Sequence, residues 1–297
     1  MHNSDRFNCR SAFTYSWAPG NMKYVKTYYV RKGSRVYGPY AYTGNRSLGR
    51  VYTERELETL ESFVETIRSH GIKRIFVLFS GGRDSLVALH LAHRVSRALK
   101  MRLKAVHIDT TISTPGNLEY VETTCKRLGI ELIVVRPKRT FFDLVERWGF
   151  PTATRRWCCY HLKIEPLKRY FAGERPLDDA LVVDGIRRDE SPRRQEFPKL
   201  GYHKHIKALC YHPIFEWDKK DVLEYIANHN LRENPLYECL PRAAECWCTA
   251  FKTARQFKIL KQICPELFAK FVELEAKLRT GGSALFSKGR RIYLRDL

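Results

Sequence analysis

The sequence predicts an α/β protein organised around a doubly wound parallel β-sheet. Three observations predict this class: short apolar runs rich in β-branched residues, amphipathic helical segments between those runs, and one glycine turn that leads from a strand into a helix. The chain has 297 residues, of which 44% are hydrophobic. This length suits one large domain with a small additional module, and the composition is sufficient for a packed core.

Residues 1–53 are expected to form a small, basic, β-rich module. They contain nine Lys or Arg residues against one acidic residue, and eight of the sixteen tyrosines. Segments 24–31 and 35–42 fit a hairpin that turns at Lys32-Gly33-Ser34, and residues 50–52 fit a third strand. Such a sheet could grip a nucleic-acid backbone while its tyrosines stack on bases. Equally, the tyrosines could form the thin core of a flap packed on the main domain, and both interpretations stay open.

The main domain is expected over residues 54–255. Thr53 and Glu56 fit a capping box that opens its first helix. Buried strands and helices then alternate, as is typical of a parallel sheet with crossover helices. Strands are expected at 75–79, 103–108, 131–135 and 180–183, with helices beginning at Ser85 and covering 118–128. Residues 256–297 are expected to add two amphipathic helices, broken near Pro265, and a basic tail.

A glycine turn joins the strand 75–79 to the helix that follows it. Glycines let the backbone approach a ligand closely, and the free amides of a helix start favour an anion. The residues expected to hold phosphate are Ser80, Gly81, Gly82 and Ser85, with Asp84 positioning a metal ion or the loop. Asp109 ends the next strand and should border the same nucleotide, because ligands of such sheets lie beyond the carboxyl ends of the strands. A plain βα turn is the alternative.

A second group of polar residues follows the apolar strand 180–183. Gly185 and Arg187 come directly after it, and Arg193 and Arg194 lie a few residues further on. Arginines at a strand end can bind phosphate or sulfate oxygens with two nitrogens at once. Asp189 and Glu190 are expected to orient these arginines, and a basic loop in solvent is the alternative.

The nine cysteines are unevenly distributed along the chain. Cys158 and Cys159 are adjacent and stand among Arg and Lys residues, which lower thiol pKa values and favour metal ligation. Cys246 and Cys248 form a second group, with Cys239 shortly before it. Two such groups suit an iron–sulfur cluster or a structural zinc ion, and buried inert cysteines are the alternative.

The charge of the chain indicates a polyanionic partner. Its formal net charge is +21 and its pI is about 9.7, which favours nucleic acid over a merely solubilising basic surface. No apolar run approaches the roughly 20 residues needed to span a membrane, and no signal peptide is visible at the start. We therefore expect a cytoplasmic protein with reduced cysteines and no membrane partner.

The turn Ser80-Gly81-Gly82-Arg83-Asp84-Ser85 resembles the PP-loop of the ATP-pyrophosphatase superfamily, whose fold is the adenine nucleotide alpha-hydrolase type. Later segments are similar to the phosphoadenylylsulfate (PAPS) reductase family of that superfamily. They follow the family's order, and the resemblance extends over about residues 72–255. The segments that carry it are the cysteine pair with Leu162-Lys163-Ile164 and Pro166-Leu167, residues 183–194, residues 213–217, Asp221-Val222, Tyr225-Ile226, and residues 234–237.

This resemblance implies a 4Fe–4S cluster. In iron–sulfur members a Cys-Cys pair and a later Cys-x-x-Cys hold the cluster, which implies Cys158, Cys159, Cys246 and Cys248 as ligands here. The second pair has one spacer residue instead of two, so Cys239 competes as the fourth ligand and zinc is the second choice of metal.

The family performs two kinds of chemistry. One branch uses ATP with Mg²⁺ to adenylylate an acceptor, such as tRNA or DNA, before sulfur is transferred. In this branch Asp84, Lys163 and Arg187 would be the catalytic residues. A sulfur-donor protein and a homo-oligomer are compatible with this branch. The other branch reduces an adenylated sulfate to sulfite with a cysteine on the C-terminal tail. The last cysteine here, Cys264, lies in a predicted helix, which favours the first branch. A nucleotide- or nucleic-acid-binding module without chemistry is a third alternative.

Overall fold

The structure is a computed structural model of the 297-residue chain. It describes residues 9–10, 27–32, 35–41, 51–240, 246–278, 285–287 and 290–297. No helix among these residues is long and apolar enough to cross a membrane.

Four short antiparallel strands precede the main domain. The predicted hairpin is confirmed, because β2 (Thr27–Lys32) pairs with β3 (Arg35–Ala41). The third predicted strand is also present as β4 (Val51–Thr53), beside β3, and β1 (Cys9–Arg10) pairs with β2. Gly33 and Ser34 of the predicted turn, and the tyrosine side chains of these strands, lie outside the described part, so the role of the tyrosines stays a prediction.

The centre of the molecule is a six-stranded sheet in the order β7-β6-β5-β8-β10-β9. Its four predicted strands are β5 (Arg74–Leu78), β6 (Arg102–Ile108), β7 (Glu131–Val135) and β8 (Ala180–Val183). All are parallel, and so is β10 (Ala208–Tyr211). Sequence analysis did not predict β10 or the antiparallel edge strand β9 (Leu200–His203), because neither contains a β-branched residue, whereas β8, of the same length, ends in two valines.

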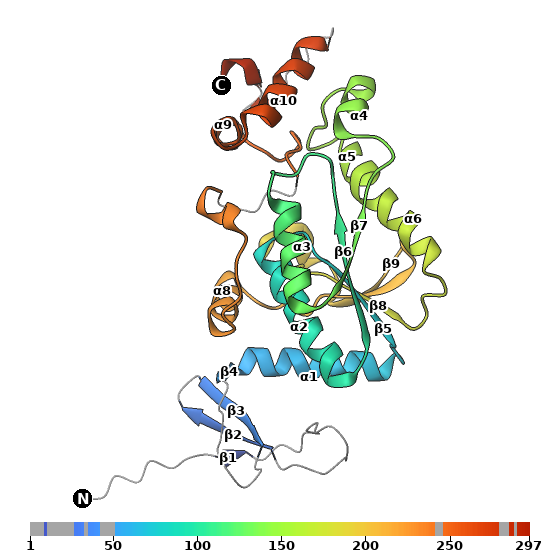
Figure 1. Ribbon diagram of the computed structural model, residues 1–297, viewed down its shortest axis with the longest axis vertical. Coiled ribbons are helices and arrows are strands. Elements are labelled where there is room, and N and C mark those ends of the chain that lie inside the picture. The colour runs from blue at the N-terminus through green and yellow to red at the C-terminus, as the bar shows by residue number, and fades with distance from the viewer. Residues whose placement is uncertain are drawn as a thin grey trace, which may run out of the picture.

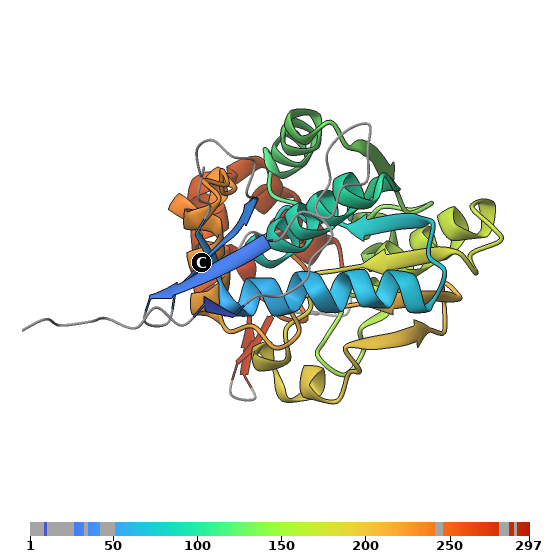
Figure 2. The same cartoon turned by 90° about the horizontal axis from the view of Figure 1, so that it is seen from below.

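Helices cover both faces of this sheet (Figures 1 and 2). Because side chains alternate along a strand, Ile75 and Val77 pack against one helical layer, whereas Phe76 packs against Phe171 on the other. The first layer is built from α1 (Glu54–Ser69), α2 (Arg83–Leu99) and α3 (Asn117–Leu128), and the second from α6 (Glu165–Gly173). Helix α8 (Lys219–Asn228) packs beside α2.

Thr53 caps α1, accepting a hydrogen bond from the Glu56 amide at 3.1 Å, but the predicted capping box is incomplete, because the Glu56 side chain does not return to the Thr53 amide. The Glu56 carboxylate contacts Arg94 on α2 and His229 after α8, at 3.0 Å from the histidine Nε2. This buried carboxylate therefore joins three helices.

A separate apolar core lies beyond the carboxyl ends of the strands, at the top of Figure 1. Phe141, Phe257 and Phe271 meet there from α4 (Phe141–Trp148), α9 (Ala254–Ile263) and α10 (Pro265–Lys277). The predicted break between two C-terminal helices is present at Cys264, before Pro265. The strands β11 (Leu285–Ser287) and β12 (Arg290–Ile292) form a hairpin after them.

Candidate nucleotide and cysteine site

The glycine turn forms a compact loop between β5 and α2. Gly81 has φ of +87°, and a side chain there would meet the Asn117 Oδ1 at 2.5 Å, so only glycine fits. Ser80 Oγ lies 3.0 Å from Ser85 Oγ, and Ser85 Oγ donates to the Gly82 carbonyl at 2.9 Å. The loop thus has the tight turn and helix start that an anion site requires.

Two buried asparagines hydrogen-bond to the backbone of this loop. Asn117 donates to the Ser80 carbonyl at 3.2 Å, and Asn234 donates to the Gly81 carbonyl at 3.1 Å. Asn234 also donates to Asn117 Oδ1 at 2.8 Å. Because both carbonyl groups point toward the asparagines, the peptide N–H groups that follow them point to the opposite side of the loop. Sequence analysis missed Asn117, since a polar residue at a helix start has many ordinary roles.

The short helix Pro235–Glu238 lies against the start of α2. Arg83 donates to both carboxylate oxygens of Glu233, at 2.8 and 2.7 Å, and its guanidinium lies 3.9 Å from the Tyr237 ring centroid. The Glu233 hydrogen bond raises the pKa of Arg83. Tyr237 Oη accepts a hydrogen bond from the Arg83 amide at 3.0 Å, so this hydroxyl lies at the anion-binding end of the helix.

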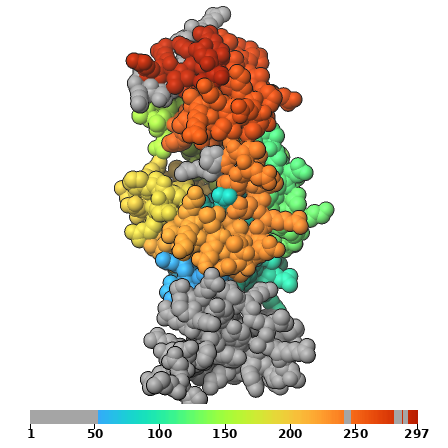
Figure 3. All heavy atoms as spheres, turned by 90° about the vertical axis from the view of Figure 1, so that its left-hand side faces the viewer, coloured from blue at the N-terminus to red at the C-terminus, as the bar shows by residue number. Residues whose placement is uncertain are grey.

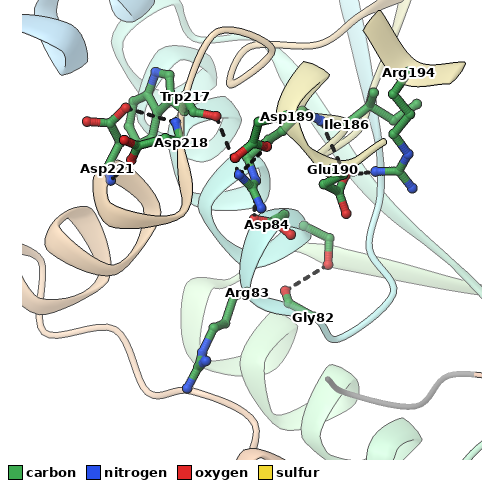
Figure 4. Close-up of polar contacts among 12 residues, drawn as sticks. Gly82, Arg83, Asp84, Ile186, Asp189, Glu190, Arg194, Trp217, Asp218 and Asp221 are labelled. Atoms are coloured by element: carbon green, nitrogen blue, oxygen red, sulfur yellow. Dashed lines mark hydrogen bonds and ion pairs between the residues drawn. The ribbon is translucent and has the colours of Figure 1, made fainter. Parts of the chain in front are cut away.

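Arg187 is buried between the carboxylates of Asp84 and Asp189, which lie near one another in Figure 4. It donates to Asp84 at 2.8 Å and to Asp189 at 2.6 Å, and it lies 3.4 Å from the Trp217 carbonyl oxygen. We expected this guanidinium to bind phosphate or sulfate; two of its nitrogens hold carboxylates instead, so a contact with a nucleotide stays a proposal. Its position fixes the side chain of Asp84.

The other residues expected after β8 divide between the loop and the surface. Gly185 packs directly on the nucleotide loop, because a side chain there would lie 2.5 Å from the Asp84 carbonyl carbon. Arg194 forms an ion pair with Glu190, whereas Arg193 is exposed. The expectation that Asp189 and Glu190 contact arginines is confirmed.

Asp109 lies beyond the end of β6. It accepts hydrogen bonds from the Thr111 amide at 3.0 Å and from Arg136 Nε at 2.9 Å. In the space-filling view the surface is hollowed where the yellow, orange and red-orange segments meet, and a patch in the cyan of the α2 start shows close by (Figure 3). The surface is therefore hollowed close to the segment that contains the start of α2.

An aspartate–histidine pair at this edge was not predicted. Asp184 and His212 follow the neighbouring parallel strands β8 and β10, and His212 Nδ1 lies 2.7 Å from Asp184 Oδ1. Asp184 also accepts from the Ile186 amide at 3.0 Å. A polar residue directly after a buried strand was the available signal for Asp184, but β10 itself was not recognised.

The two cysteine groups meet beyond the strand ends. Cys158 lies in α5 (Trp157–Cys159), which continues into a π-helical turn over Tyr160–Ile164. The thiol of Cys158 hydrogen-bonds with those of Cys159 and Cys248, and Cys248 also hydrogen-bonds with Cys246. Cys239 is exposed at the end of the helix Pro235–Glu238.

Charge and hydrogen bonding favour thiolates in this group. The hydrogen bond from Cys158 lowers the pKa of Cys159 to about 6 and that of Cys248 to about 3, and the Lys163 charge acts in the same direction. The same contacts raise the pKa of Cys158, which keeps its proton and donates it. Lys163 therefore lies close enough to act on the sulfur atoms.

Backbone contacts tie the second cysteine group to the sheet. Trp247 donates from its amide to the Ile112 carbonyl at 3.0 Å and from its indole to Thr114 Oγ1 at 2.8 Å. Ile112 and Thr114 belong to the loop that follows β6 and Asp109. The cysteines and the nucleotide loop therefore lie at the same edge of the sheet.

The donor set fits a metal cluster. Thiolates are the form in which cysteine binds metals, and the buried indole nitrogen of Trp157, adjacent to Cys158, has no hydrogen-bond acceptor among the described residues. A sulfur-rich group would supply such an acceptor. Within the described part of the chain no three His, Cys, Asp or Glu side chains are placed so that they could hold a metal ion.

Residues 74–244 match the model of the phosphoadenosine phosphosulfate reductase domain. The chain belongs to this family. The match covers β5 to the helix Pro235–Glu238, which includes the nucleotide loop and the first cysteine pair. The predicted resemblance to PAPS reductases and the predicted PP-loop fold class are thereby confirmed.

Several curated proteins are similar to this PAPS reductase family member. Two uncharacterized proteins of Methanocaldococcus jannaschii are 28% and 34% identical to it, over 74% and 67% of this chain. The chain spans 52% and 41% of their lengths, or about half. The adenosine 5'-phosphosulfate reductase 2 of Bacillus subtilis is 25% identical, over 66% of this chain and 80% of its own length.

Two solved structures are also similar. One is the phosphoadenylyl-sulfate reductase of Candida auris, with TM-score 0.46, 19% identity, and coverage of 62% of this chain and 83% of that one. The other is the U34-tRNA thiolase of Methanococcus maripaludis with its 4Fe–4S cluster, with TM-score 0.48, 15% identity, and coverage of 76% and 80%. Neither likeness says which substrate this chain uses.

Proposed function

We propose that this PP-loop protein is an enzyme that uses ATP to adenylylate an acceptor in a nucleic acid and then transfers sulfur to it. The observation that carries the proposal is the contact among the thiols of Cys158, Cys159, Cys246 and Cys248 at the strand ends that also carry the nucleotide loop. Sulfur chemistry and nucleotide binding would then share one site.

In the first step an acceptor oxygen would attack the α-phosphorus of ATP. A phosphorus–oxygen bond to the acceptor forms, and the bond to pyrophosphate breaks. The loop Ser80–Ser85 would hold the phosphates, and Asp84, fixed by Arg187, would position Mg²⁺. This step needs no cysteine.

In the second step a sulfur nucleophile attacks the acceptor atom that bears the adenylylated oxygen; a bond from sulfur to that atom forms, the bond to the oxygen breaks, and AMP leaves with the oxygen. The four cysteines would hold a 4Fe–4S cluster, and because four thiolates would ligate all of its irons, a separate donor would supply the sulfur that is transferred. Lys163 would stabilise negative charge that develops between the cysteines and the nucleotide, because its charge already acts on Cys159 and Cys248. Zinc is the alternative occupant of these ligands.

The proposed acceptor is nucleic acid, tRNA or DNA. A net charge of +21 is the main support, since phosphate backbones bind basic proteins strongly. A separate sulfur-donor protein and self-association are compatible with this activity.

Reduction of an adenylated sulfate is the second candidate. It is favoured by relatives named adenosine 5'-phosphosulfate reductase, of which three are 25%, 28% and 26% identical to this chain. In that reaction a thiolate attacks sulfur, the nucleotide leaves, and external thiols supply the electrons that release sulfite.

Parallel assays on one anaerobic preparation distinguish the two functions. The first offers ATP and nucleic acid and measures pyrophosphate; the second offers adenylylsulfate or its 3'-phosphate with a thiol and measures sulfite. We expect iron in the protein and pyrophosphate release that depends on nucleic acid. Sulfite formation without nucleic-acid-dependent pyrophosphate would overturn the sulfurtransferase proposal.

A further inference from the structure

An exposed aromatic ring lies beside the cysteine group. Phe251 follows Cys248 by three residues and is 58% exposed. The Arg156 guanidinium, two residues before Cys158, lies 5.6 Å from the centroid of this ring. The segment that carries Cys248 thus supplies the Phe251 ring, and the segment that carries Cys158 supplies the planar Arg156 cation. Both side chains are exposed to solvent.

A second exposed ring follows the cysteine pair in the sequence. Tyr160 follows Cys159 directly and is 42% exposed. Its ring centroid lies 5.1 Å from that of His161 and 6.1 Å from that of His205. Aromatic and cationic planes therefore occur next to both segments that carry the cysteines, although exposing such rings forgoes the free energy of burying them.

These segments also contain no acidic residue. No acidic residue occurs between Glu146 and Glu165, or between Glu245 and Glu266. Arg155, Arg156 and Arg255 are exposed within them. An anionic partner would meet no carboxylate on either segment, whereas an unpaired carboxylate here would weaken binding.

We propose that Phe251, Arg156 and Tyr160 form a landing surface for an unpaired nucleobase of a single-stranded nucleic-acid segment. The bases of single strands stack on exposed rings and on guanidinium planes, and their phosphates bind nearby arginines. The surface would hold the acceptor base beside the cysteines, so the inference rests on the proposed function and specifies its substrate as an unpaired region rather than a duplex.

The test is binding of fluorescein-labelled oligonucleotides of about 15 nucleotides, a length within the range that such surfaces occupy, to the full chain. Oligo-uridine RNA, oligo-thymidine DNA and a duplex are compared by anisotropy. Phe251→Ala should weaken single-strand binding roughly 5- to 150-fold, as loss of one stacked base does. Phe251→Trp should keep it. Preference for RNA over DNA identifies the natural strand, and either preference supports the inference.

The matched control is Tyr202→Ala, because Tyr202 is 68% exposed on β9 but belongs to neither cysteine segment. It should bind as the unchanged protein does. Arg156→Ala should reduce the slope of log affinity against log salt by about 0.7, the loss of one single-strand phosphate contact. Three results would each overturn the inference. Phe251→Ala and Tyr202→Ala could weaken single-strand binding equally, Phe251→Ala could leave it unchanged, or the duplex could bind as tightly as the single strands.

Pyrophosphate release separates this inference from the proposed function. If the landing surface is wrong but the function is right, Phe251→Ala releases pyrophosphate with nucleic acid as the unchanged protein does. If the function is wrong, the unchanged protein releases none, even where Phe251→Ala weakens strand binding.

Discussion

Single residues distant in sequence determine the shape of the nucleotide loop. Asn117 and Asn234 fix the carbonyls of Ser80 and Gly81, and Arg187 fixes the Asp84 carboxylate. Each contact is a hydrogen bond within a buried or half-buried site, where an unsatisfied partner is costly. The loop is therefore preorganised by its surroundings rather than by its own sequence alone.

The close contact of Gly185 with the loop gives a prediction at this scale. Gly185→Ala places a methyl group 2.5 Å from the Asp84 carbonyl carbon. We expect a loss of about 1–3 kcal/mol in the free energy of unfolding and weaker ATP binding, because the loop backbone must shift. Urea denaturation and calorimetric titration with ATP measure these two effects.

Gly173→Ala is the matched control, since a side chain there meets nothing within 4 Å. Its stability should be unchanged or raised by up to about 1 kcal/mol. Normal stability and normal ATP binding by Gly185→Ala would show that the loop does not depend on this close approach.

At the scale of elements, the helices are joined by a buried carboxylate. Glu56 on α1 contacts Arg94 on α2 and His229 after α8, and its side chain is 1% exposed. Glu56→Ala leaves the Arg94 charge without this partner, so we expect a loss of about 3 kcal/mol in the free energy of unfolding. Urea denaturation measures it.

The exposed Glu58 on the same helix is the control. Glu58→Ala should change stability by less than about 0.5 kcal/mol. If Glu56→Ala and Glu58→Ala lower the free energy of unfolding by the same small amount, the contact of Glu56 with Arg94 contributes no more to stability than a surface charge does.

The cysteine segments give a second prediction at this scale. If the proposed sites are right, replacing Cys158 and Cys159 together with Ser should abolish bound iron or zinc but leave ATP binding intact, because the proposed phosphate ligands Ser80–Ser85 include neither cysteine. Cys239→Ser should keep the full metal content, since Cys239 is exposed whereas the other four thiols contact one another.

Metal analysis of anaerobic samples and titration with ATP provide the measurements. Metal retained by the Cys158→Ser, Cys159→Ser double variant would refute the ligand assignment. Loss of metal from Cys239→Ser would instead make that residue the fourth ligand, as the sequence left open.

At the scale of the whole molecule, the net charge predicts how affinity for nucleic acid depends on salt concentration. With a net charge of +21, binding to nucleic acid should release many counterions. We predict that affinity for single strands falls at least roughly tenfold between about 50 and 200 mM salt, and that affinity for ATP falls much less. Anisotropy and calorimetry at several salt concentrations test this. A flat salt dependence would argue against a nucleic-acid partner.

Much of the overall organisation could be predicted because its signals are local. The run 75–79 followed by Gly81 and Gly82 predicts a strand, a turn and an anion site from neighbouring residues alone, and the alternation of later elements predicts a parallel sheet. Strands β9 and β10 were missed because, unlike β8 of the same length, they contain no β-branched residue.

The sequence by itself determined the fold class, the nucleotide loop and the family, since these depend on periodicity, glycine positions and the order of motifs. Only the tertiary structure decided the partners: Arg187 holds carboxylates, Asn117 holds the loop, His212 meets Asp184, and Cys158 contacts Cys248. The physical reason is that each of these contacts joins segments far apart in the chain, and their meeting depends on how the strands are ordered in the sheet and how the C-terminal helices pack over their ends.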